Sequence, residues 1–252
     1  MQLYQADLHI HTCLSPCGSL TMLPKEIVHA AKTAGLDIIV ITDHNSAENV
    51  AAVIKAGEQE RLIVLPGMEV TSKEEIHILG LFDSVVALQQ LQEQVYAHLP
   101  GENDPDVFGI QLVVNSEGEP IEINSYLLIG ATTLSIEEIV QQIHKLDGLV
   151  IAAHIDRPSY SILSQLGFIP VELALDGVEI SASVDYATAC RRFPEECSRC
   201  PILSGSDAHS LEDIGKVRTG FYLANPCFAE IKQVLNNRSN WGNIVHLKNT
   251  IA

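Results

Sequence analysis

Short apolar runs alternate along the chain with longer segments in which apolar residues recur at helical spacing. The strand-like runs are residues 7–11, 36–44, 62–71, 75–82, 149–156, 176–181, 201–210 and 219–224. The helical patterns are residues 23–35, 46–60, 83–99, 135–148 and 225–237. Strands that alternate with helices are typical of a parallel sheet, either open or closed into a barrel.

Several residues mark the ends of these helices. Pro24 suits a first helical turn and Gly35 a helix C-terminus. Ser46 is the predicted N-cap of the second helix. Ser135, followed three residues later by Glu138, predicts a capping box at the start of the fourth helix.

The alternation is interrupted at about residues 100–131. This segment is rich in turn-forming residues, and two strand-like runs flank the sequence SEGEP, which predicts a β-hairpin insertion. We find no repeat and no linker. We therefore expect a single domain over residues 1–252 that carries this insertion.

The composition is that of a globular protein. Of the 252 residues, 46% are hydrophobic and 19% are charged, so a large core can form. No apolar run approaches the roughly 18 residues of a membrane span, and the N-terminus lacks the pattern of a signal peptide. We expect a cytoplasmic protein with no membrane partner, and its six cysteines are expected to be reduced.

The chain is strongly acidic, with 32 acidic and 15 basic residues and a formal net charge of −17. This charge argues against binding of duplex nucleic acid, where basic residues neutralise phosphates. It does not exclude a small phosphorylated substrate, because bound divalent cations reverse the sign of a local site. Short single strands of nucleic acid also stay open as substrates.

Metal-binding residue types collect at the ends of the strand-like runs. In the first run, His9 and His11 are two residues apart and therefore leave the same face of a strand. Taken alone, each such residue has another explanation, such as a surface histidine or a helix N-cap. The carboxyl ends of strands in a parallel barrel meet on one face, however, which favours a common metal site. The candidate ligands are His9, His11, His44, Glu69, His77, His154, Asp207 and His209, with Cys17 as a possible ninth.

The number and type of these ligands restrict the metal. Imidazoles combined with carboxylates suit Zn²⁺, Mn²⁺ or Fe²⁺ better than Ca²⁺ or Mg²⁺. A single tetrahedral zinc uses about four ligands, so more than one ion is expected. Glu69 or Asp207 is a candidate for a carboxylate that bridges two ions.

Four motifs, in this order, resemble those of the PHP family, which is named for polymerase-associated and histidinol-phosphatase members. They are DLHIHT, ITDHNS, GMEVTS and SGSDAHS, and the resemblance spans about residues 6–224. It implies a distorted, TIM-like (β/α)7 barrel that holds two or three divalent transition metal ions. It also implies hydrolysis of phosphoesters by a metal-bound hydroxide.

The carried-over ligands are His9, His11, His44, Glu69, Asp207 and His209. His77 and His154 correspond to the middle histidines of the family, and Asp43 is expected to support the ligands rather than to bind metal. Cys17 stands where members often carry histidine or aspartate. It is either a packed turn residue or a metal ligand.

The site residues suggest catalytic roles and several functions. Asp207 or His209 is a candidate proton donor to the leaving group, and Arg157 is a candidate phosphate-binding residue or a surface arginine. We expect a metal-dependent phosphatase that acts on a small phosphomonoester, such as a nucleotide or an amino-alcohol phosphate. The alternatives are a 5′-to-3′ exonuclease or nucleoside bisphosphate phosphatase, and a metal-binding module without catalysis. A zinc site at Cys190, Cys197 and Cys200 is the less favoured reading of that cysteine group.

Overall fold

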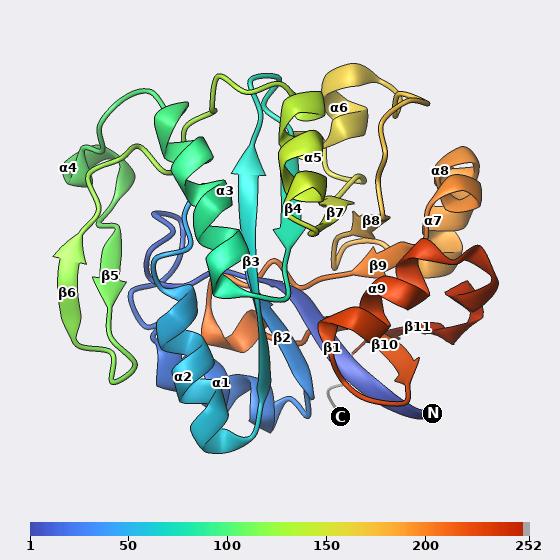
Figure 1. Ribbon diagram of the computed structural model, residues 1–252, viewed down its shortest axis with the longest axis horizontal. Helices are drawn as coiled ribbons and strands as arrows, with labels where there is room; N and C mark the ends of the chain where they lie inside the picture. The colour runs from blue at the N-terminus through green and yellow to red at the C-terminus, as the bar shows by residue number, and fades with distance from the viewer. Residues whose placement is uncertain (249–252) are drawn as a thin grey trace.

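The structure, a computed structural model, describes residues 1–248 and combines strands and helices along the whole of this range (Figure 1). The strands are β1 (Gln2–Ile10), β2 (Ile38–Ile41), β3 (Ile63–Thr71), β4 (His77–Leu81), β5 (Leu112–Val114), β6 (Pro120–Ile123), β7 (Leu149–Ala152), β8 (Gly177–Ile180), β9 (Ile202–Ser204), β10 (Val217–Leu223) and β11 (Ile244–Lys248). The α-helices are α1 (Pro24–Thr33), α2 (Val50–Glu60), α3 (Val85–Ala97), α4 (Pro105–Phe108), α5 (Ile136–Lys145), α6 (Ile162–Leu166), α7 (Tyr186–Arg192), α8 (Pro194–Arg199) and α9 (Phe228–Asn236). Two 3₁₀ helices, η1 (Leu211–Asp213) and η2 (Arg238–Asn243), complete the described elements.

Nine strands form one sheet in the order β11-β10-β1-β2-β3-β4-β7-β8-β9. The strands from β1 to β9 in this order follow the chain, whereas β10 and β11 are added antiparallel at the β1 edge. The two ends of the sheet approach each other, because Thr219 Oγ1 of β10 accepts from the backbone N–H of Ser204 at 2.8 Å and donates to its carbonyl at 3.0 Å. The sheet is therefore a nearly closed barrel, which confirms the expected distorted barrel fold.

β4 runs against the direction expected for a parallel barrel. It pairs antiparallel with β3 on one side and with β7 on the other. Only a tight turn separates β3 from β4, so the chain reverses without a crossover helix. As a result His77, the first residue of β4, lies opposite Thr71, the last residue of β3. This reversal places His77 at the same end of the barrel as the carboxyl ends of the parallel strands.

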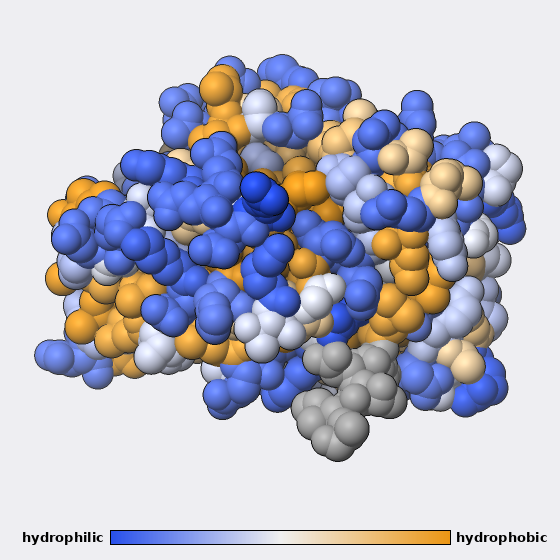
Figure 2. All heavy atoms as spheres, turned by 90° about the horizontal axis from the view of Figure 1, so that it is seen from below, coloured by the Kyte–Doolittle hydropathy of each residue, from blue (hydrophilic) through white to orange (hydrophobic). Residues whose placement is uncertain are grey.

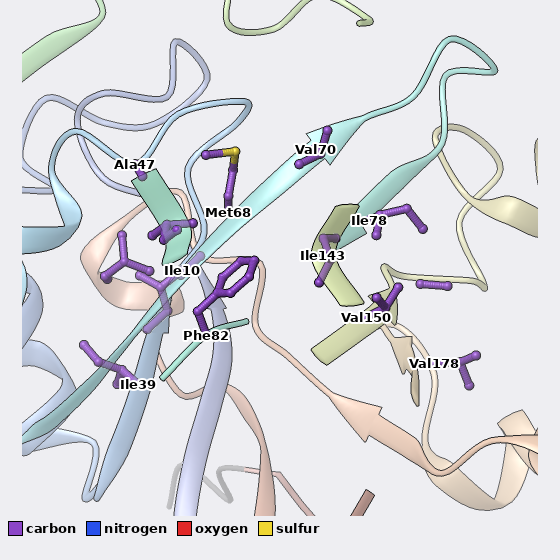
Figure 3. Packing of buried hydrophobic residues seen from close by; sticks show 14 of the residues in the cluster. Ile10, Ile39, Ala47, Met68, Val70, Ile78, Phe82, Ile143, Val150 and Val178 are labelled. Atoms are coloured by element: carbon purple, nitrogen blue, oxygen red, sulfur yellow. The ribbon is translucent and has the colours of Figure 1, made fainter. Parts of the chain in front are cut away.

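Two apolar layers hold the sheet in place. The larger layer packs the outer side of the sheet against the surrounding helices, and Figure 3 shows Phe82 and Met68 within it. The smaller layer fills the inside of the sheet and includes Leu79 and residues of α9 such as Phe228. Burial of this kind stabilises a fold by about 25 cal/mol per Å² of apolar surface.

The structure confirms one of the predicted helix N-caps and corrects another. Ser135 and Glu138 form the expected capping box at α5, with both reciprocal hydrogen bonds present. The expectation that Ser46 caps α2 is wrong, because that helix starts later, with Asn49 at the N-cap position. Ser46 Oγ instead lies 2.7 Å from the hydroxyl of Tyr96, so it links the segment before α2 to α3.

The interrupted segment at residues 100–131 contains α4 and a two-stranded sheet formed by β5 and β6. In Figure 1 this hairpin lies at the left of the molecule, beside α4 and apart from the main sheet. Asn49 fixes it to the barrel by donating from Nδ2 to the carbonyl of Leu112 and accepting from the N–H of Val114. The description of residues 1–252 as one domain with an insertion stays a prediction.

The surface mixes polar and apolar residues. On the face seen in Figure 2, hydrophilic residues predominate and hydrophobic ones lie among them. Over residues 1–248, none of the helices combines the length and the apolar character that a membrane crossing requires.

Candidate metal centre

The carboxylate of Glu69, buried near the end of β3, lies at the centre of a group of histidines. Five of the predicted ligands bring a ring nitrogen within 3.4 Å of its two oxygens. The distances are 2.8 Å for His77, 3.0 Å for His44, 3.2 Å for His154, and 3.4 Å each for His9 and His11. These residues come from β1 and the position directly after it, from the loops after β2 and β7, and from the start of β4. The structure thus places His77 and His154 beside the other predicted ligands.

Asp207 is the second carboxylate of the cluster. Its Oδ1 lies 2.9 Å from His11 Nε2 and 3.2 Å from His9 Nε2, so the two histidines of the first motif lie between Asp207 and Glu69. Its Oδ2 contacts the Arg157 guanidinium at 2.5 Å. A group of His9, His11, Glu69 and Asp207 brings one ligand atom each within 4.8 Å of the others.

His209 and Cys17 form the outer edge of the cluster. His209 Nδ1 lies 2.8 Å from the backbone carbonyl of Asp207, and its Nε2 lies 3.0 Å from the Cys17 sulfur. Although desolvation by the surrounding protein opposes the shift, hydrogen bonds from His209 and His44 lower the pKa of the Cys17 thiol to about 7. The ring of His209 lies 4.3 Å from that of His11, so this edge adjoins the buried ligands.

A cavity of about 200 Å³ leads from the surface to these residues. It is lined by Cys17, His44, Glu69, His77, Ile129, Arg157, Tyr160, Asp207 and His209. All three predicted catalytic residues, Arg157, Asp207 and His209, are therefore on its wall. His9, His11 and His154 lie behind this wall and are completely or almost completely buried.

Several residues near the cavity have unusual backbone conformations. Asn45, His154, Tyr160 and Asp207 have φ angles of 50°, 30°, 56° and 51°, in the left-handed region that residues other than glycine rarely adopt. Such conformations cost of order 1–3 kcal/mol each and persist only where the surrounding structure determines them. Their concentration on the loops that carry the ligands indicates that these loops are shaped for the site.

Asp43 supports the ligands from behind, as its place in the second motif suggested. Its two oxygens accept hydrogen bonds from the backbone N–H and hydroxyl of Thr12 and from the hydroxyl of Ser15, each at 2.7 Å. Ser15 Oγ lies in turn 3.0 Å from His11 Nδ1. Asp43 therefore fixes the orientation of the His11 ring through Ser15.

Glu179 is a buried residue of the site that the sequence reasoning missed. It lies on β8, and its oxygens are 3.0 and 3.1 Å from His9 Nδ1. It also accepts a hydrogen bond from the backbone N–H of His154 at 3.2 Å. A signal was present in the sequence, because Glu179 lies between two apolar residues of a short strand that is buried throughout. A charged residue at such a position must have a partner inside the fold.

The charges of the cluster depend on one another. Burial alone would raise the pKa of the Glu69 carboxyl, but nearby imidazoles hold it well below its usual range; they belong to His77, His9 and His44. Burial alone would likewise lower the pKa of His9. The carboxylates around it, with Glu179 the strongest contributor, instead raise that pKa well above its usual value.

The residues present fit a group of divalent cations. His44 Nδ1, His77 Nδ1 and Glu69 Oε2 are buried and have no hydrogen-bond partner, although each histidine nitrogen lies within 3.0 Å of a Glu69 oxygen. Buried polar atoms without a partner are costly, at about 1–3 kcal/mol each. A cation bound between these converging atoms would supply the partner that each of them lacks. In two further groups, one ligand atom of each residue lies within 4.8 Å of the others. These groups are His11–His44–His209 and His44–Glu69–His77.

Comparison with known families supports this assignment. The PHP domain family model matches residues 7–164, and a second model described as PHP-associated matches residues 198–239. The chain belongs to the PHP domain family. The first match alone spans more than half of the chain and includes the predicted ligands from His9 to His154.

The chain is also similar to other proteins in sequence and in fold. The uncharacterized protein MJ1587 of Methanocaldococcus jannaschii is 28% identical over 184 residues, which are 70% of this chain and 80% of that protein. A metal-dependent phosphoesterase structure from Bifidobacterium adolescentis shares the fold with a TM-score of 0.58 and 20% identity, covering 92% of this chain and 95% of that one.

A third similar structure is endonuclease Q in complex with a 27-mer duplex that has an abasic lesion at the active site. Its TM-score is 0.67 at 21% identity, and the match covers 93% of this PHP chain but only 57% of the endonuclease chain. A structure of the Pyrococcus furiosus enzyme matches over 56% of its length. This PHP chain thus spans little more than half of those endonucleases.

The endonuclease complex corrects one expectation. The exclusion of duplex nucleic acid, drawn from the net charge of −17, is wrong, because a chain with this fold is known with a duplex at its active site. Net charge sums over the whole surface, whereas binding depends on the local field around the site. Cations held by a cluster of this kind would dominate that local field.

The cysteine group near α7 and α8 does not form a comparable site. Among the described residues, the groups of three or more converging ligand atoms all lie at the barrel mouth and leave out Cys190, Cys197 and Cys200. The less favoured zinc reading of these cysteines has no geometric support.

Proposed function

We propose that this PHP protein hydrolyses small phosphomonoesters, such as a nucleotide or an amino-alcohol phosphate, with two or three bound divalent transition metal ions. The observation that carries the proposal is the Glu69 carboxylate, which five histidine nitrogens approach within 3.4 Å at the inner wall of a cavity that also holds Arg157. Cations held there would bind phosphate oxygens, lower the pKa of a bound water and offset charge in the transition state.

Arg157 is the phosphate-binding residue in this proposal. Its side chain is 40% exposed and lies on the cavity wall, where its guanidinium contacts Asp207 Oδ2. A planar guanidinium presents two parallel N–H groups that match two oxygens of a phosphate. Contact with Asp207 holds the guanidinium beside the ligand cluster before substrate enters.

The proton donor to the leaving oxygen is His209 rather than Asp207. Histidines around Asp207 keep the pKa of its carboxyl well below its usual range despite burial, so this group has no proton to give near neutral pH. His209 lines the cavity with a side chain that is 30% exposed. In this role His209 would not itself bind a metal ion. Desolvation lowers its pKa, but the hydrogen bond with Cys17 outweighs this and raises it, which favours the protonated imidazole.

The test is hydrolysis of a panel of phosphorylated metabolites and short single-stranded and duplex oligonucleotides, with Mn²⁺ and with Zn²⁺. His11→Ala and Asp207→Ala should each abolish hydrolysis while circular dichroism shows a folded protein, since residues at the catalytic face of a barrel serve chemistry more than stability. Near-normal turnover in either variant would contradict the assigned site. Elemental analysis should find at least two metal ions per chain, and one ion or none would contradict the cluster.

A second candidate function is cleavage of phosphodiesters in nucleic acid. The likeness to endonuclease Q favours it. The same candidate ligands could hold cations for either reaction, because bound cations stabilise charge in the cleavage of monoesters and diesters alike. Cleavage of the oligonucleotides without hydrolysis of the phosphomonoesters would favour this function over the first.

A further inference from the structure

Two apolar side chains face the cavity beside the charged residues. Ile129, which follows the β5–β6 hairpin, and Tyr160, in the loop between β7 and α6, both line it together with Arg157. Ile129 is 36% exposed and Tyr160 is 43% exposed. Neither is needed to bind metal or phosphate. We call this pair the apolar wall of the cavity.

Ile129 is held in place by Asn45, the residue directly after His44. Both N–H groups of the Asn45 side chain donate, each at 2.8 Å, to the carbonyls of the two residues that flank Ile129. Asn45 is itself buried, adopts a left-handed φ of 50°, and accepts a hydrogen bond from the N–H of Thr71. One motif therefore supplies a metal ligand and fixes the backbone on both sides of Ile129.

Tyr160 is held in place by His77. The two rings stack with centroids 4.7 Å apart and planes 24° from parallel, and the Tyr160 carbonyl accepts the backbone N–H of His77 at 2.9 Å. Tyr160 also has a left-handed φ of 56°. A bulky residue in this conformation is strained unless the surrounding structure determines it, and such strain is concentrated at ligand-binding sites.

The pair therefore consists of exposed apolar groups on loops that are anchored to the ligand-bearing segments. Ligand sites combine apolar surfaces of this kind with a few charged groups that fix orientation. On the basis of the proposed function, we infer that Ile129 and Tyr160 form a subsite for a planar aromatic group joined to the phosphate of the substrate. Arg157 and the metal ligands would hold the phosphate while the wall contacts the ring. A nucleobase and a simple aryl group both have this chemistry.

Three substrates test the subsite: adenosine 5′-monophosphate, ribose 5-phosphate, which lacks only the base, and phenyl phosphate, which has a ring without a sugar. With Mn²⁺ present, kcat/KM should be higher for both ring-bearing compounds than for ribose 5-phosphate. Tyr160→Ala should lower this preference by about tenfold, the effect expected for loss of one stacking partner. A higher kcat/KM for adenosine 5′-monophosphate than for phenyl phosphate would assign the ring to a nucleobase, and the reverse would assign it to an aryl ester.

Matched variants separate the subsite from general damage. Tyr160→Phe keeps the ring and should keep the preference, and Ile129→Ala should weaken it as Tyr160→Ala does. Tyr222→Ala, which removes a tyrosine on β10 that is 39% exposed and does not line the cavity, should have no effect. A wild-type protein without the preference, or a preference unchanged in both Tyr160→Ala and Ile129→Ala, would overturn the inference.

A binding measurement keeps the inference separate from the proposed function. If the protein hydrolyses none of the three compounds, the proposed function rests on the remaining phosphomonoesters of the panel. Equilibrium binding of the same compounds to the metal-loaded protein then tests the subsite alone. The ring-bearing compounds should bind more tightly, and Tyr160→Ala should remove the difference. Equal binding of all three compounds by the wild-type protein would overturn the inference.

Discussion

The Glu179 carboxylate lies 3.0 Å from Nδ1 of His9, on the opposite side of the ring from the nitrogen that approaches Glu69 and Asp207. A carboxylate at this position fixes the proton on Nδ1 and leaves Nε2 free to bind metal. It also makes the imidazole a stronger ligand. We therefore propose that Glu179 is a positioning residue, which would act on bound metal through His9.

We predict that Glu179→Gln lowers the affinity for the divalent ions by about 10- to 100-fold, as loss of such a partner does at other metal sites. The reason is that an amide cannot provide the same charge or fix the proton on His9. Competition with a chelator of known affinity measures the change. Glu122→Gln, on the exposed strand β6, is the control and should bind as the wild type does. Equal affinities in both variants would show that Glu179 only fills space.

Gly205→Ala tests the same contact without removing a charge. A Cβ atom at this position would lie 2.2 Å from Glu179 Oε2 and 2.9 Å from the His9 Cβ, so the carboxylate would have to move. We expect a loss of metal affinity similar to that of Glu179→Gln, and little further loss when both changes are combined. Gly242→Ala, where a Cβ meets nothing within 4 Å, is the control. Additive losses in the double variant would argue against a shared cause.

We predict that Arg157→Ala raises KM for a phosphomonoester by about tenfold, with a smaller loss in kcat, because the guanidinium grips the phosphate alike in ground state and transition state. Arg157→Lys should restore only part of the binding, because a lysine lacks the two-pronged geometry. Steady-state kinetics measure both parameters, with the exposed Arg192→Ala as the control. Unchanged kinetics in Arg157→Ala would show that this residue is a surface arginine.

We predict that Cys17→Ser selectively loses zinc, because a thiolate favours Zn²⁺ over Mn²⁺ more than a hydroxyl or carboxylate does. The Cys17 sulfur lies 3.0 Å from His209 Nε2, within reach of the group His11–His44–His209. Cys17→Asp should shift activity toward Mn²⁺. Metal content and alkylation rates with and without chelator are the measurements, and the exposed Cys227→Ser is the control. Full zinc content in Cys17→Ser would show that Cys17 is not a metal ligand.

A prediction on pH concerns His246, which lies on β11 far along the chain from the metal ligands. Burial lowers the pKa of His246 to about 4 from an ordinary value of 6.5. Between these two values the unfolded chain binds a proton that the folded protein does not, so the free energy of unfolding should fall as the pH drops through this window. In His246→Gln this fall should be smaller. Denaturant unfolding at pH 7 and pH 5 measures it, with His29→Gln as an exposed control, and parallel curves for His246→Gln and wild type would contradict the prediction.

The grouping of the candidate ligands could be predicted from the sequence because most of them follow apolar strands directly. His44 and Asp207 both come just after a strand, where the barrel architecture alone brings them together. His77 fitted the pattern less well because β4 runs antiparallel, and a strand direction is not encoded in a short apolar run. The reversal became visible only in the pairing of β4 with both of its neighbours.

Other parts of the site depended on contacts between distant segments. Glu179 and Gly205 are close in space because β8 and β9 are neighbours. Glu179 belongs to none of the four motifs, and the motif SGSDAHS, which contains Gly205, does not reveal this contact. Ile129 and Tyr160 lie in loops whose course is set by Asn45 and His77 rather than by local propensity. Sequence patterns predict regular elements well, but they carry little information on the path by which a long loop returns to the sheet.

The contact between His11 and Asp207 joins residues that are 196 positions apart. On the ribosome, the two histidines of β1 therefore emerge long before the carboxylate that completes their site exists. A large loop must close before the two ends meet, which is a slow and entropically costly step. The predicted metal cluster can therefore form only after Asp207 has been synthesised, so a chain that stops before this residue cannot assemble the complete site.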